Sequence, residues 1–199
     1  MAIPIFGGVA AVSGTVVEAL FGNKWMEAAP MLLPLALAMI LHALMAVAGP
    51  VLWGKGAAGA ELKVQFWVAL AFVAALLIAS RYSMVVVAWA VCAVYAVRLF
   101  WLTTALMRHI QLPMSMLLRA LGGGVLMGGV IASLLLVSDA MLGEIPATLR
   151  LAVEIGMSGL VLLLFVLGLP RLVLSAELLW VAQRLLARMP RLSRSRWLR

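Results

Sequence analysis

The residues that could do chemistry in this chain are a few ionisable side chains inside long apolar stretches. His42 lies midway along one stretch, Arg98 lies inside another, and Arg119 lies near the start of a third. Arginine stays charged in proteins, so each arginine at such a position needs water, an anion or a carboxylate beside it. Arg98 and Arg119 could together form a cationic lining for a phosphate-bearing lipid, and His42 could contact a substrate or carry a proton.

Each of these residues also has a purely structural interpretation. Long basic side chains can extend from a span to the lipid headgroups, and a neutral histidine can hydrogen-bond a neighbouring helix. Glu18 lies near the end of the first stretch, close to Lys24, where interfacial placement explains it equally well. Arg150 and Glu154 are four residues apart and are expected to pair. The sequence leaves both interpretations open.

No catalytic or metal-binding motif accompanies these residues. The sequence contains no phosphate-binding glycine loop followed by lysine and serine or threonine, no HExxH, no nucleophile elbow and no metal-spaced Cys/His cluster. His42 and His109 lie on different segments, and the single cysteine, Cys92, is expected to be a small buried thiol. We therefore predict neither an enzyme nor a cofactor or metal site.

The elements that position these residues are predicted to be membrane-spanning helices. The chain is 66% hydrophobic and 11% charged, with a mean hydropathy of +1.19, whereas soluble domains are about half apolar and a quarter charged. A span needs roughly 20 apolar residues, and a backbone in lipid must satisfy its own hydrogen bonds. We predict an all-α integral membrane bundle over residues 1–171, with about six spans at residues 3–21, 31–52, 64–80, 83–107, 114–137 and 151–169.

The net charge of +8 is concentrated at the C-terminal end, where seven of the fifteen basic residues follow Pro170. Residues 172–199 are predicted to form an amphipathic basic helix and tail on anionic headgroups, with a solvated tail as the alternative. Its lipid-facing arginines would be Arg184, Arg188, Arg191, Arg194 and Arg196. Because Lys55, Lys63 and Arg108 would share this side, the positive-inside rule predicts two cytoplasmic termini. No aromatic-interleaved basic patch indicates a nucleic-acid partner.

Small residues and prolines mark special positions within the spans. Gly124, Gly128 and Gly129 have small-xxx-small spacing with later small residues, which favours close packing of helices. Flexibility for gating is the alternative. Pro34 and Pro50 lie within or at the end of the second predicted span, where a proline interrupts the backbone hydrogen bonds and could mark a moving joint.

The stretch Leu20-Phe21-Gly22-Asn23-Lys24-Trp25, with Ala28-Ala29 after it and Pro4 to Gly8 before it, resembles a pattern of polysaccharide and O-antigen flippases. These flippases belong to the superfamily of multidrug, oligosaccharidyl-lipid and polysaccharide exporters. The resemblance covers most of the chain, but only the segment from Phe21 to Trp25 is at all specific. It implies a carrier in the bacterial inner membrane for oligosaccharide linked to undecaprenyl pyrophosphate, with Arg98, Arg119 and His42 near the pyrophosphate.

The chain departs from this family in its number of spans. Family members have twelve to fourteen spans in two lobes around a central cavity, whereas this sequence predicts six, matching the later part of the family. Transport would then require a missing N-terminal lobe or a second copy of the chain. A small-molecule or drug exporter of the same superfamily, with Glu18 in an acidic cavity, is one alternative. A membrane assembly subunit that transports nothing is another.

Overall fold

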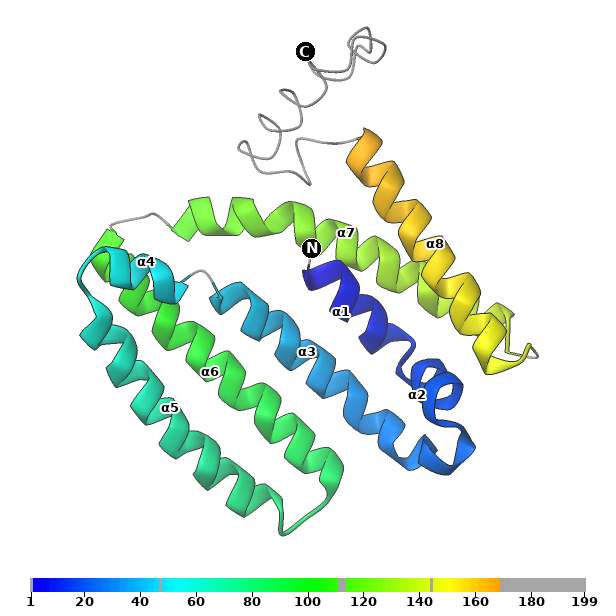
Figure 1. The fold of residues 1–199 in the computed structure, drawn as a ribbon, viewed down its shortest axis with the longest axis horizontal. Helices are drawn as coiled ribbons and strands as arrows, with labels where there is room; N and C mark the ends of the chain where they lie inside the picture. The colour runs from blue at the N-terminus through cyan, green and yellow to red at the C-terminus, as the bar shows by residue number, and fades with distance from the viewer. Residues whose placement is uncertain (1, 47, 111–113, 144, 169–199) are drawn as a thin grey trace, which may run out of the picture. The chain divides into compact units, whose positions relative to one another are not determined.

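The computed structural model describes residues 2–46, 48–110, 114–143 and 145–168, with the backbone alone for residues 110, 114–120 and 167–168. These residues form helices joined by short connections, and no strand occurs among them. In chain order (Figure 1), the helices are α1 (Ala2–Ala11), α2 (Ser13–Phe21), the 3-10 helix η1 (Asn23–Ala28), α3 (Ala29–Met45), α4 (Ala48–Gly54), α5 (Ala58–Ala79), α6 (Met84–Ile110), α7 (Met114–Met141) and α8 (Ala147–Gly168). The predicted all-α class is confirmed. The predicted tail helix, residues 172–199, lies outside the described residues.

Five stretches of the described chain are long and apolar enough to cross a membrane, and α1 with α2 makes a sixth if the bent pair counts as one span. The mean hydropathy of each is between 2.0 and 2.3. The five stretches are Asn23–Gly54, Ala58–Ala79, Met84–His109, Leu121–Met141 and Ala147–Val166. Helices of this length and composition match the thickness of the hydrocarbon core, so the chain is embedded in a membrane.

The chain divides into two compact units, residues 1–154 and residues 155–199. Helix α8 begins in the first unit and continues into the second, where residues 155–168 are described as helix. All the contacts discussed below lie within the first unit. In that unit α6 packs against α3 and α5, and α1 packs against α3 and α7 (Figure 1).

The first predicted span is not one straight helix. Helices α1 and α2 meet at Val12 with a bend of 78°, and the backbone of Val12 leaves the helical region with φ −113° and ψ 36°. The N–H of Val12 still donates to the Gly8 carbonyl at 3.2 Å, and the N–H of Val16 donates to the Val12 carbonyl at 3.0 Å. The corner therefore forms without a proline, next to the small residues Ser13 and Gly14.

The second predicted span is divided into α3 and α4, and here proline gives the physical reason. Pro50 lies in the first turn of α4, and it lacks the N–H that would donate to the carbonyl of Ala46 in a continuous helix. Helix α3 accordingly ends at Met45, and α4 begins at Ala48. Pro34, in contrast, lies within an uninterrupted α3.

Close packing in the first unit uses glycines of α1 and α7. An added Cβ on Gly128 would lie 2.8 Å from Cγ2 of Ile3 and 3.4 Å from its backbone, and one on Gly124 would lie 3.3 Å from the Ile3 side chain. This is the close approach that small-xxx-small spacing favours. Gly129 differs from the prediction: it is exposed, and no described atom lies within 4 Å of such a Cβ. One residue rotates the helix by about 100°, which turns Gly129 away from α1.

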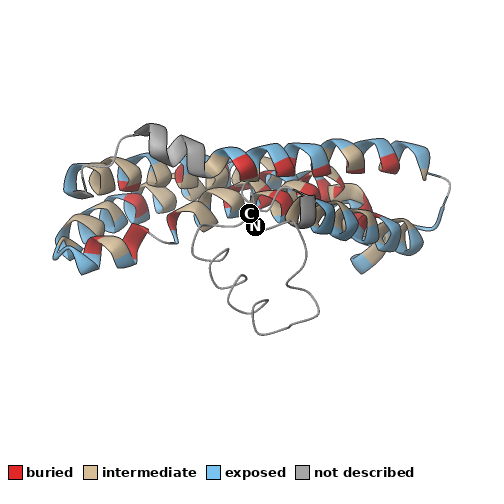
Figure 2. Ribbon diagram, turned by 90° about the horizontal axis from the view of Figure 1, so that it is seen from above, coloured by how far each residue is buried: buried red, intermediate tan, exposed pale blue. Residues whose placement is uncertain are grey.

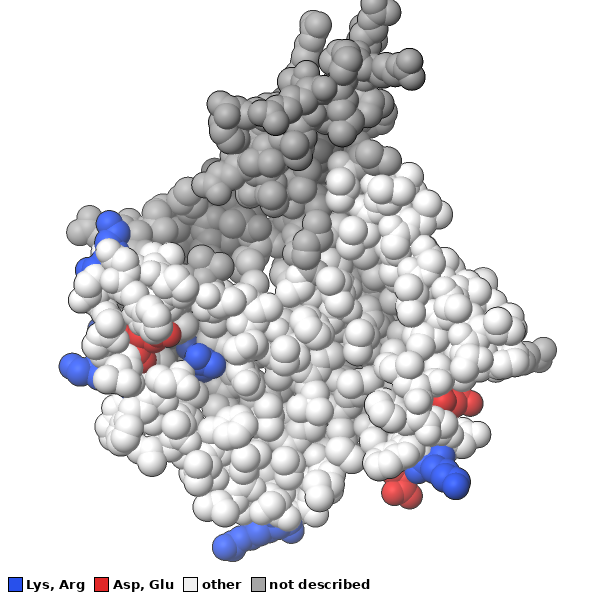
Figure 3. All heavy atoms as spheres, viewed as in Figure 1, with Lys and Arg blue, Asp and Glu red and all other residues white. Residues whose placement is uncertain are grey.

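The surface of the first unit has the pattern expected for lipid as solvent. Figure 2 shows buried residues between the helices and exposed residues on their outer sides. Figure 3 shows a wide field without charged side chains, which are mostly gathered toward its edges. Several large exposed aromatic side chains lie toward helix ends, where aromatic rings anchor membrane proteins at the headgroup level. They include Phe21 at the end of α2, Trp25 in η1 and Trp53 near the end of α4.

Candidate functional site

Arg98 lies beside a cavity of about 320 Å³ between α5 and α6. Gln65 of α5 and Tyr95 of α6 are the other polar lining residues. The remaining lining residues are apolar: Val68, Ala69, Phe72, Val73 and Val94. Arg98 precedes the end of α6 by about 18 Å of helix rise, so its Cα is well inside the span. The cavity therefore offers a cation and two neutral hydrogen-bonding groups at membrane depth.

His42 adjoins the same group of residues through Tyr95. The two rings meet edge to face, with centroids 5.5 Å apart and planes at 84°. His42 comes from α3 and Tyr95 from α6, and the packing of these two helices produces the contact. His42 is exposed on the surface of the chain, in the last turn of the apolar helix α3.

Arg98 has no carboxylate within ion-pair distance among the described residues. An unpaired guanidinium in a span is stable only where water or an anion reaches it. The same requirement applies to Gln65, about 10 Å of helix rise from the start of α5, and to His42, in the last turn of α3, because both residues are exposed rather than buried against other helices. The four residues His42, Gln65, Tyr95 and Arg98, which we call the polar face, are thus suited to a water-filled cavity and poorly suited to lipid.

The second predicted arginine does not join this group in the described structure. Arg119 lies in α7, whose backbone is described there, but its side chain is outside the described residues. Cys92 is only half buried on α6, which differs from the expectation of a buried thiol. The next residue along α6, Ala93, is exposed.

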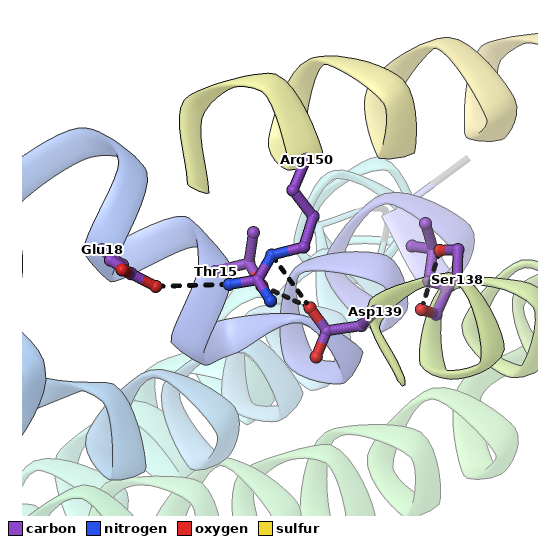
Figure 4. Close-up of polar contacts among 6 residues, drawn as sticks. Thr15, Glu18, Ser138, Asp139 and Arg150 are labelled. Carbon is purple, nitrogen blue, oxygen red and sulfur yellow. Dashed lines mark hydrogen bonds and ion pairs between the residues drawn. The ribbon is translucent and has the colours of Figure 1, made fainter. Parts of the chain in front are cut away.

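A second polar group, which we call the Arg150 cluster, joins α2, α7 and the start of α8 (Figure 4). The guanidinium of Arg150 pairs with Glu18 at 3.2 Å, between Nη2 and Oε2, and with Asp139 at 3.5 Å, between Nε and Oδ1. The hydroxyl of Thr15, which is 3% exposed, donates to the same Oδ1 of Asp139 at 2.5 Å. Glu154, one turn after Arg150, is 1% exposed and interacts electrostatically with Asp139 and Arg150.

The Arg150 cluster is best explained as a connection between helix ends. Asp139 lies in the last turn of α7 and Arg150 in the first turn of α8, so the side chains come from the two sides of one interhelical connection. Thr15 and Glu18 lie one turn apart on α2, which follows the bend at Val12, and they contribute to the cluster from that helix. Charged groups that pair in this way can remain in a low-dielectric region.

Sequence reasoning included Glu18, Arg150 and Glu154 but missed Asp139 and Thr15. The predicted fifth span ended at residue 137, which placed Asp139 in a connecting loop, whereas α7 continues to Met141. A helical continuation past Val137 would have placed Asp139 on the same face as Leu135, which is buried. That buried neighbour is the signal that could have indicated an inward-facing acid.

Comparisons with protein families, with curated proteins and with solved structures found no match to this chain. Among the described residues, no group of three or more His, Cys, Asp or Glu side chains is arranged to hold a metal ion. The site must therefore be interpreted from its own chemistry. This chemistry consists of an arginine that pairs with no acid of the described chain, beside a cavity, and a separate, paired cluster of charges.

Proposed function

We propose that this chain is one lobe of a membrane carrier for a phosphate-bearing, lipid-linked oligosaccharide, as the resemblance to polysaccharide flippases implies. In this proposal Arg98 contacts the pyrophosphate of the substrate, and Gln65, Tyr95 and His42 supply neutral hydrogen bonds around it. The observation that carries the proposal is the guanidinium of Arg98 beside an open cavity at membrane depth, with no carboxylate of the described residues within ion-pair distance. An arginine fork matches phosphate oxygens in geometry as well as in charge.

The exposure of the polar face supports a carrier with a second wall. His42 and Gln65 would lie against acyl chains if this unit worked alone, and that arrangement is unfavourable. A second copy of the chain or another helical lobe facing them would enclose a water-filled site at the middle of the membrane. We accordingly place the protein in a bacterial inner membrane, with both termini in the cytoplasm, where Lys55, Lys63 and Arg108 satisfy the positive-inside rule.

The drug-exporter alternative depends on an acid free to bind a cationic solute. The residue that the sequence offers for this role, Glu18, pairs with Arg150 at 3.2 Å. The paired state favours a structural role for Glu18 over a substrate site. The cationic polar face, by contrast, fits an anionic substrate.

The proposal is tested by measuring how the purified chain, in neutral detergent, binds undecaprenyl pyrophosphate. We expect Arg98→Ala to weaken binding at least tenfold, because a charge-assisted hydrogen bond contributes about 1.5–3 kcal/mol. Arg98→Lys keeps the charge and should retain part of the affinity. Arg81→Ala is the matched control, since Arg81 is an exposed arginine in the connection between α5 and α6 and lies outside the cavity.

Equal affinity of the Arg98→Ala and Arg81→Ala variants would remove Arg98 from the proposed site. Absence of binding by the unmodified chain, alone or with a second lobe, would reject the substrate class. In cells, Arg98→Ala should reduce export of surface polysaccharide at unchanged protein level. Normal polymer from that variant would also contradict the proposal.

A further inference from the structure

A second cavity, of about 470 Å³, lies between α3, α4 and α6 and is bordered by α7. Its walls are apolar except for Thr103 and Thr104, and the Thr104 hydroxyl already donates to the Trp101 carbonyl at 2.8 Å. Residues on both sides of the break between α3 and α4 contribute to the walls. Among the apolar lining residues are Leu41, Met45, Val51, Ala96, Leu99 and Phe100.

A cavity of this composition does not hold water well, because its walls offer few hydrogen bonds. Its volume lies in the range of small-molecule sites, and an empty cavity forfeits the dispersion contacts of every atom on its walls. In a membrane the surrounding solvent consists of acyl chains. The cavity is therefore suited to one acyl chain of a lipid.

The position of the cavity along α6 matches the depth of one leaflet. Ala96 lies at one end of the α6 wall, and Arg108 follows it by twelve residues, or about 18 Å of helix rise. Half of a hydrocarbon core is about 15 Å thick. A chain in the cavity would thus extend from headgroup level near Arg108 toward the middle of the membrane.

Basic side chains stand at the headgroup end of the cavity. Lys55 follows Val51 by one turn at the end of α4, Arg108 follows Thr104 by one turn at the end of α6, and both are exposed. Lys63 and His109 lie at the same end, and the Nδ1 atom of His109 is 2.8 Å from the Ala105 carbonyl. The one described acid there, Glu61, turns its carboxylate toward Gly49. The charge at this end is therefore positive and complements an anionic headgroup.

We propose that the cavity between α3, α4 and α6 binds one acyl chain of an anionic phospholipid of the surrounding membrane, with the phosphate held by Lys55 and Arg108. The proposal is independent of the carrier function, because it involves neither Arg98 nor the polar face. The bound lipid would fill the space that the Pro50 break leaves beside α6. It would also stabilise this end of the bundle, as any ligand of the folded state does.

The test titrates the delipidated full chain, in neutral detergent, with dioleoyl phosphatidylglycerol and follows the rise in melting temperature. Dioleoyl phosphatidylcholine is the headgroup control, and we expect phosphatidylglycerol to bind at least tenfold more tightly. The double substitution Lys55→Gln with Arg108→Gln should weaken the binding of phosphatidylglycerol about thirtyfold. Each basic residue near the membrane surface contributes about fivefold to the affinity. Lys24→Gln with Arg81→Gln, which removes two exposed charges elsewhere, should leave the affinity unchanged.

The acyl-chain part of the proposal is tested by filling the cavity. Ala96→Phe places a ring in the cavity and should abolish the rise in melting temperature that phosphatidylglycerol causes. Ala93→Phe, on the same helix but outside the cavity, should preserve this rise. If Ala96→Phe fails to fold, Ala96→Leu provides the smaller change and should weaken binding at least fivefold. An unchanged affinity in the folded variant would overturn the assignment of the cavity.

Two further results would also overturn the proposal. Equal binding of phosphatidylglycerol and phosphatidylcholine would show that no anionic headgroup is recognised. Stronger binding of undecaprenyl phosphate than of phosphatidylglycerol would assign the cavity to an isoprenoid chain. The Arg98→Ala variant distinguishes the two sites, because it leaves this cavity intact. We expect this variant to lose binding of undecaprenyl pyrophosphate and to keep binding of phosphatidylglycerol.

Discussion

Replacing Arg150 with methionine is expected to lower the free energy of unfolding by about 3 kcal/mol, since removing one partner of a buried ion pair leaves the other charge uncompensated. The change would leave Glu18, Asp139 and Glu154 together without their cation. Arg150 is 13% exposed, while its partners Glu18 and Asp139 are 32% and 36% exposed, so water offsets part of the loss. The measurement is the melting temperature in mild detergent, with an expected decrease of about 6–12 °C.

A double-mutant cycle separates the ion pair from other effects of the substitution. Glu18→Gln and Arg150→Gln should each lower the free energy of unfolding. The double variant should lose less than the sum of the two single losses, because the two groups contact each other. Arg81→Met is the control for loss of an arginine outside the cluster. If Arg150→Met and Arg81→Met lower the melting temperature equally, the Arg150 cluster does not hold α2 to α7 and α8.

Gly128→Leu is expected to separate α1 from α7 and to cost about 2–3 kcal/mol, as overpacking of a well-packed contact does. A Cβ at this position already lies 2.8 Å from Ile3 Cγ2, and the Ile3 backbone at 3.4 Å prevents a simple side-chain rearrangement. Gly129→Leu is a closely matched control, because no described atom lies within 4 Å of its Cβ. It should be neutral or slightly stabilising, since leucine has the higher helix propensity.

Thermal unfolding in detergent compares the melting temperatures of the two glycine variants. A separate variant with Ile3→Cys and Gly128→Cys tests the contact in the folded chain by disulfide cross-linking. Cross-linking should be fast in a cysteine pair at 3 and 128 and slow in the pair at 3 and 129. Similar melting temperatures for Gly128→Leu and Gly129→Leu would contradict the packing of α1 on α7.

The membrane class was predictable from the sequence because lipid allows few backbone structures. A segment such as residues 84–107 cannot satisfy its hydrogen bonds in lipid except as a helix, so hydropathy alone located α6 within a few residues. The break before α4 was also indicated by Pro50. The bend at Val12 was not, because no proline lies there and its position depends on what α2 contacts elsewhere in the chain.

The candidate sites were predictable only in part. Arg98 and His42 stood out because ionisable residues are rare within spans. Their relation through Tyr95 could not be inferred, because apolar residues lie on most sides of α3 and α6 and leave no clear hydrophobic stripe to fix how each helix is rotated. The pairing of Thr15 with Asp139 joins residues 124 positions apart, and no local pattern in the sequence specifies such a partner.

The distance in sequence between Glu18 and Arg150 has a consequence for biogenesis. The two partners are 132 residues apart, and ribosomes add about 5–20 residues per second, so Glu18 is made on the order of ten seconds before its arginine. During that time the nascent α2 carries Glu18 without its arginine partner, and we expect this acid to keep α2 near the aqueous edge of the insertion machinery. We therefore expect the first segment of the chain to reach its final place in the bilayer only after the last described helix has begun to emerge.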